Sequence, residues 1–127
     1  MLRPKKLQDL MGQLESRGVE CAMLLTWDGS LLASSTSLVP TASSRVKVIA
    51  AVASNAMRSL SLSTDPGPRE EPGMIFLECE GAWIGIHSVS DIMILCVVTD
   101  SLTSPGMLSL KLRSTVAYLH REIQRIT

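Results

Sequence analysis

The chain has 127 residues, of which 46% are hydrophobic and only 3% aromatic. We therefore expect a single domain, residues 1–127, with a core of aliphatic side chains and methionine, and little surface for base stacking. Twelve lysine and arginine residues balance twelve aspartate and glutamate residues, and this zero net charge disfavours nucleic acid or an anionic membrane as a partner.

The first elements predicted are a short helix and a β-hairpin. Residues 4–18 carry a proline near the start, leucines at helical spacing and a closing glycine. The apolar run 19–26 is typical of a strand. Asp28 and Gly29 then form a strong hairpin signal, and residues 31–33 continue as a second strand.

A second helix is predicted after a serine-rich loop. The loop covers residues 34–44 and contains Pro40, and Ser43 or Ser44 can cap a helix that runs to about residue 60. In helical projection one face of this helix is apolar. Its members are Val46, Ile49, Ala53, Ala56, Met57 and Leu60.

The apolar arc of the second helix is wider than one sheet face requires. Val48, Ala51, Val52 and Asn55 fall beside or beyond the first apolar face, so the arc exceeds half of the helix circumference. This excess suggests that the helix contacts something besides its own sheet.

The second half of the chain predicts three strands and a final helix. A proline-rich loop over residues 61–73 precedes strands at residues 74–79, 82–89 and 92–99. The last strand is apolar at both parities, as in central strands covered on both faces. Ser104 and Pro105 open the last helix. The order α-β-β-α-β-β-β-α predicts an α/β (α+β) fold, a five-stranded, mostly antiparallel sheet with helices on both faces.

The sequence contains no arrangement of residues typical of an active site. His87 is expected on a strand surface and His120 on the polar side of the last helix, and neither has further ligands at metal-site spacing. Cys21, Cys79 and Cys96 lie far apart in apolar runs, which favours buried free thiols in a reducing compartment. We predict that the chain is not an enzyme and has no catalytic, metal or cofactor site.

No secretory signal or membrane insertion is expected either. The first residues are charged and lack an apolar core, and the longest purely apolar run, residues 92–98, is too short to cross a bilayer.

The strand at residues 74–79 presents an apolar edge that needs a partner or a cover. Met74, Phe76 and Glu78 fall on one side of it, and the alternate residues on the other. An uncovered apolar edge strand promotes aggregation unless another strand pairs with it. Another subunit could cover this edge and the second helix together; alternatively, both are covered within the chain.

Five segments in register resemble the roadblock/LC7 family, whose module is longin- and profilin-like, and most of all its members in Ragulator, the late endosomal and lysosomal adaptor. They are residues 1–5, 24–25 with 28–33, 50–55, 94–96 and 106–108.

The resemblance implies a scaffold without catalytic residues or cofactor. Such a subunit pairs with another roadblock subunit into a heterodimer, and a lipidated subunit wraps around the pair and holds it at the cytoplasmic face of the late endosome or lysosome. The assembly docks Rag GTPases and supports mTORC1 and MAP kinase signalling. The loops at residues 34–44 and 61–73 depart from the family pattern.

The family pattern places the partner interface on the second helix and the third strand. The residues at matching positions are Val48, Ala51, Val52, Asn55, Met74, Phe76 and Glu78. Leu2, Leu7 and Leu10 are candidates for contact with the wrapping subunit, or for packing on the sheet.

Two other functions stay open from the sequence. One is a homodimeric roadblock protein that acts as a dynein light chain or a small-GTPase regulator. The other is an enzyme or small-ligand binder on a profilin-like fold.

Overall fold

The computed structural model describes residues 9–13, 19–35, 40–62, 74–79 and 81–126, and the side chains of these except at residues 40–46, 60–62 and 123–126. Residues 9–13 are helical, within the first predicted helix. Five strands and two long helices follow: β1 (Val19–Thr26), β2 (Leu31–Ser34), α2 (Pro40–Leu62), β3 (Met74–Cys79), β4 (Ala82–Ser88), β5 (Met93–Asp100) and α3 (Pro105–Ile126).

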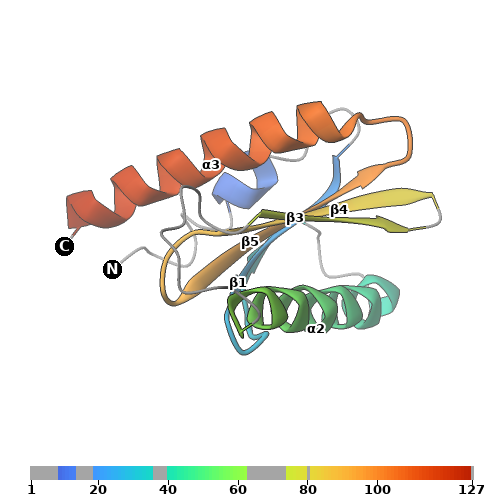
Figure 1. Ribbon diagram of the computed structural model, residues 1–127, viewed down its shortest axis with the longest axis horizontal. Helices are drawn as coiled ribbons and strands as arrows, with labels where there is room; N and C mark the ends of the chain where they lie inside the picture. Colours follow the sequence, from blue (N-terminus) through green and yellow to red (C-terminus); the bar gives the residue numbers. More distant parts are fainter. Residues whose placement is uncertain (1–8, 14–18, 36–39, 63–73, 80, 127) are drawn as a thin grey trace.

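The five strands form one sheet in the order β2-β1-β5-β4-β3, and every neighbouring pair is antiparallel. Helix α3 and residues 9–13 cover one face, and α2 covers the other (Figure 1). The predicted fold class is therefore confirmed. Strand β5 is central and buried along almost its whole length, as its apolar pattern predicted. The β1–β2 pairing contains a bulge between Leu24 and Leu25.

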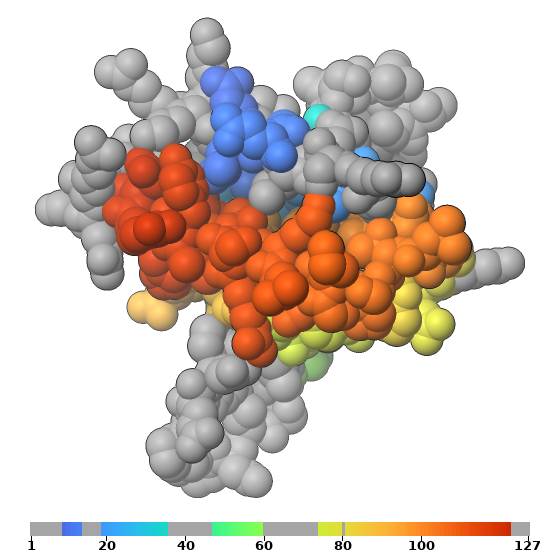
Figure 2. Space-filling view, turned by 90° about the horizontal axis from the view of Figure 1, so that it is seen from above, coloured from blue at the N-terminus to red at the C-terminus, as the bar shows by residue number. Residues whose placement is uncertain are grey.

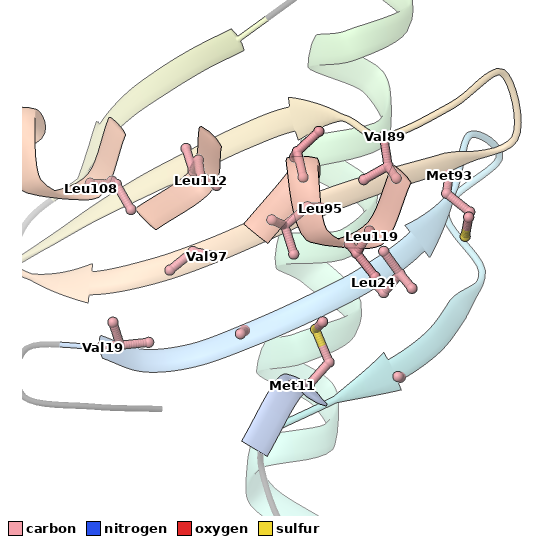
Figure 3. Packing of buried hydrophobic residues seen from close by; sticks show 13 residues of the cluster. Met11, Val19, Leu24, Val89, Met93, Leu95, Val97, Leu108, Leu112 and Leu119 are labelled. Atoms are coloured by element: carbon pink, nitrogen blue, oxygen red, sulfur yellow. The ribbon is translucent and has the colours of Figure 1, made fainter. Parts of the chain in front are cut away.

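The core on the α3 side is formed by aliphatic side chains from the helix and the sheet. Leu108 and Leu112 of α3 are buried together with Leu95 and Val97 of β5 (Figure 3). Gly85 lies beneath the helix, where an added Cβ would be 2.7 Å from Cδ1 of Leu112 and 2.9 Å from Cδ2 of Leu108. The absence of a side chain at this position therefore allows α3 to approach the sheet closely.

The core on the α2 side is a second, separate cluster. Ala53 and Met57 of α2 are buried with Ile94 and Cys96 of β5. Strand β5 thus supplies alternate residues to the two clusters, which is why it is apolar at both parities.

Helix α2 begins earlier than predicted. It begins at Pro40 and ends at Leu62, whereas the expected start was Ser43 or Ser44. A proline lacks the N–H that the first helical residue does not need, and its fixed φ suits the helix, so Pro40 belongs to the first turn instead of the preceding loop. Predicted core residues Val46 and Leu60 lie outside the described side chains.

Three further expectations need correction. His87 was expected on a strand surface but is only 5% exposed, because it lies on the face of β4 that α3 covers. Cys79 was expected to be buried but is exposed at the end of edge strand β3. Ile92 was expected within the last strand, but it lies in the β4–β5 turn and is 68% exposed.

Candidate partner interface

The outward face of α2 carries an apolar stripe that no described part of the chain covers. Val48 is 63% exposed and Val52 is 44% exposed, and Ala51 and Asn55 are exposed beside them. Asn55 accepts a hydrogen bond through Oδ1 from Nη2 of Arg58, at 2.8 Å. We call Val48, Ala51, Val52 and Asn55 the α2 stripe. A helix surface of this kind, with small and β-branched side chains, allows close approach of a second helix.

The side chains of α2 divide into a buried set that faces the sheet and an exposed set that faces away from it. Ala50, Ala53 and Met57 point at the sheet and are buried, whereas Ile49 and Ala56 are half-buried at the margin. The stripe lies on the opposite side of the helix from these residues. The stripe therefore takes no part in the packing of α2 on the described sheet.

Strand β3 is the outermost strand on one side of the sheet. It pairs with β4 from Met74, opposite His87, to Cys79, opposite Ala82. Its first four residues are half-buried and its last two exposed. Its outer edge faces no other strand of the described sheet, and an edge strand can pair with a further strand through its backbone.

The side chains of β3 divide between the two faces of the sheet. Met74 and Phe76 pack against the cluster under α3, and Met74 Sδ accepts a hydrogen bond from the Ser109 hydroxyl at 3.8 Å. Glu78, of the same parity, is exposed. The three predicted interface side chains of β3 therefore do not lie on the same side of the sheet as the α2 stripe.

Ile75 and Leu77 lie on the α2 side instead. Both are half-buried and pack against the α2-side cluster, and their cross-strand neighbours Ile86 and Ile84 belong to the same cluster. Strand alternation alone separates the two sets of residues, but only the position of α2 shows which set lies on the α2 side of the sheet.

The described residues form no group of histidine, cysteine, aspartate and glutamate able to hold a metal ion. Nδ1 of His87 lies 2.7 Å from the carbonyl oxygen of Ser88. Cys21 and Cys96 are buried, and burial raises the pKa of the Cys96 thiol far above its ordinary value, which makes it a poor nucleophile.

Apolar side chains are also exposed on α3 and near the N-terminus. Helix α3 is seen from outside the sheet in Figure 2. Its exposed large apolar side chains are Met107 (53% exposed), Leu110 (64%) and Tyr118 (38%). Leu10 is half-buried and packs against the α3-side cluster, whereas Leu2 and Leu7 lie outside the described residues. Among the described helices, none has the length and apolarity to cross a membrane.

Among the described residues, an antiparallel five-stranded sheet lies between two helical layers, with β3 at one edge and the α2 stripe exposed. The Roadblock/LC7 domain model matches residues 5–99, and the chain belongs to this family. A Caenorhabditis elegans protein described as a Ragulator complex protein LAMTOR2 homolog is 29% identical over 127 residues, which cover 100% of this chain and 97% of that protein. This match supports the closeness to the second LAMTOR subunit of Ragulator and an adaptor-like role.

Solved structures share the fold. Myxococcus xanthus MglB matches with a TM-score of 0.77 at 18% identity, over 100% of this chain and 96% of that chain. A Roadblock/LC7 domain from Streptomyces avermitilis matches with a TM-score of 0.72 at 18% identity, over 93% and 98% of the two chains.

Proposed function

We propose that the chain is a non-catalytic scaffold subunit of a Ragulator-type complex. It pairs with another roadblock subunit and helps to recruit and regulate Rag GTPases for mTORC1 and MAP kinase signalling. The match to a LAMTOR2 homolog along the whole chain supports this proposal. The observation that carries it is the α2 stripe, an exposed apolar helix surface on a chain whose helix is already held by its other face.

In the proposed pair, the α2 stripe packs against the corresponding helix of the partner. Val48 and Val52 would become buried, each stabilising the pair by on the order of 1 kcal/mol. Ala51 allows the two helices to approach closely, and Asn55 supplies a polar contact at the margin.

Strand β3 would extend the sheet into the partner through backbone hydrogen bonds. On the α2 side, Ile75 and Leu77 join the proposed contact because they lie at the same sheet edge and are only half-buried. Met74, Phe76 and Glu78 lie on the other side of the same edge. There they would meet side chains of the partner strand next to α3.

A second partner, a lipidated wrapping subunit, would bind the outer face of α3 and hold the pair at the cytoplasmic face of late endosomes and lysosomes. The exposed side chains of Met107, Leu110 and Tyr118 support this assignment, because they lie outside the set of α3 residues buried against the sheet. Attachment to the membrane would then occur through this partner, without insertion of the chain itself.

Light scattering of the purified chain tests the proposal, first alone and then mixed with the other Ragulator roadblock subunit. A one-to-one heterodimer is the expected result. A monodisperse monomer that binds no roadblock subunit would refute the proposal.

A homodimeric GTPase regulator is the second candidate, and the similarity to MglB over the whole chain favours it. The same experiment separates the two functions, since a stable homodimer that ignores the other Ragulator subunit would support the regulator and exclude the scaffold.

A further inference from the structure

We propose that one end of the sheet binds a basic, apolar peptide segment of another protein. The site is formed by Trp27, Leu31 and Ile92, with the carboxylates of Asp28 and Asp91 beside them, and we call these five residues the Trp27 site. It goes beyond the proposed function, and its test does not depend on pairing through α2 and β3.

The Trp27 site is assembled from two turns that lie side by side at one end of the sheet (Figure 3). Nε1 of Trp27 donates a hydrogen bond to the carbonyl oxygen of Ser90 at 2.9 Å, which ties the β1–β2 turn to the β4–β5 turn. Thr26 pairs with Met93 in the sheet, so the residues that follow Thr26 and precede Met93 emerge next to each other.

The apolar side chains of this site are more exposed than the fold requires. Ile92 is 68% exposed and Leu31 is 43% exposed. Trp27 is half-buried, with part of its side chain packed against the α2-side cluster. An isoleucine in a tight turn contributes little to the core at this exposure. An aromatic ring and aliphatic side chains exposed on two adjoining turns are instead typical of the centre of a binding site.

Each of the two turns carries a carboxylate and no cation of its own. Asp28 and Asp91 are exposed, and residues 26–32 and 88–93 contain no lysine, arginine or histidine. The Thr26 hydroxyl and the backbone N–H of Ser30 donate to the Asp28 carboxylate and hold the pKa of Asp28 below its ordinary value. Its charge therefore persists into mildly acidic solution.

This charge pattern selects the occupant. A segment with lysine or arginine next to aliphatic side chains complements both the carboxylates and the apolar centre. A second copy of the same site would bring like charges together, and an anionic membrane would be repelled.

Both turns are held by internal hydrogen bonds before any ligand arrives. The N–H groups of Val89 and Ser90 donate to the carbonyl oxygen of Met93 at 2.9 and 3.2 Å, and Ile92 N–H donates to the Ser90 hydroxyl at 3.2 Å. A preformed surface loses little conformational entropy on binding. Trp27 and Leu31 lie toward the β2 edge, away from β3, so the site and the proposed pairing surface can be occupied together.

Calorimetric titration of the full chain with two synthetic peptides tests the proposal. One peptide alternates lysine and leucine, and the other has glutamate in place of every lysine. We expect that only the lysine peptide binds, and that its binding is saturable. Asp91→Lys or Ile92→Ser should raise its dissociation constant at least about tenfold. Leu102→Ser is the matched control, since Leu102 is 91% exposed in the turn that follows β5; it should leave binding unchanged.

The result also has a direct optical readout. In a Trp83→Phe background Trp27 is the sole tryptophan. The lysine peptide should shift the fluorescence emission of Trp27, and the titration of this shift should give the same dissociation constant as calorimetry. The proposal is overturned if the lysine peptide does not bind, if both peptides bind alike, or if Leu102→Ser weakens binding as much as Ile92→Ser does. All three substituted positions of the calorimetric series are exposed, so each variant should keep the urea midpoint of the unsubstituted chain.

Discussion

Replacing Val52 by aspartate separates the stability of the chain from its capacity to pair. Val52 is 44% exposed on the outward face of α2, so a carboxylate there stays in water in the isolated chain. Valine and aspartate also have similar helix propensities. The free energy of unfolding of Val52→Asp should therefore change by less than about 1 kcal/mol.

In the proposed heterodimer the same carboxylate becomes buried without a counter-charge. Leaving one charge buried and unpaired costs about 3–5 kcal/mol. Because every 1.4 kcal/mol changes a dissociation constant about tenfold, pairing should weaken by roughly one hundred- to four thousand-fold. Met57→Asp makes the contrasting case, since Met57 is 2% exposed in the core. There the loss of packing and the buried charge together approach the whole stability of a domain, about 5–15 kcal/mol, so this variant should unfold.

Urea unfolding followed by circular dichroism measures the first quantity, and light scattering of the mixture with the roadblock partner measures the second. Ser114→Asp is the matched control, because it adds the same charge at an exposed position of α3 and should leave pairing intact. If Val52→Asp still co-purifies with the partner, the α2 stripe is not the pairing surface.

Three further predictions follow from particular contacts. Gly85→Ala should lower the free energy of unfolding by about 1–3 kcal/mol, because the new methyl group meets Leu112; an unchanged urea midpoint would contradict this. Asp100 accepts a hydrogen bond from the Thr103 hydroxyl at 2.8 Å, which lowers the pKa of Asp100. Asp100→Ala should therefore destabilise the chain at neutral pH. The difference in urea midpoint between this variant and the unsubstituted chain should shrink as the solution is acidified through the lowered pKa of Asp100. A difference that stays constant with pH would argue against the hydrogen bond. Ellman's reagent should modify exposed Cys79 rapidly and buried Cys96 hardly at all, and pairing should slow the reaction at Cys79; equal rates with and without partner would place β3 outside the interface.

Most of the fold could be predicted from local patterns. The hairpin was predicted from Asp28 and Gly29. The φ of Gly29 is 96°, which lies in the left-handed region that glycine tolerates. The central place of β5 followed from apolar residues at both parities, because only a strand covered on two faces buries both sets. The hairpin and the central strand depend on residues that are neighbours in the sequence, which is why they can be predicted from it.

The side of the sheet to which each interface residue belongs could not be predicted in this way. The pattern of β3 separates Met74 and Phe76 from Ile75 and Leu77, but it does not show which pair faces α2. That assignment depends on the β3–β4 register and on the side that each helix covers. The burial of His87 has the same cause.

The two edges of the sheet are unequal, and this limits how far strand pairing can propagate. Strand β3 offers six residues in uninterrupted register with β4, whereas β2 has four residues and is joined to β1 through a bulge. If two such modules join through β3, both ends of the merged sheet are β2 strands. Short, irregular edges resist the addition of further strands, so growth terminates at two modules and a fibre is avoided.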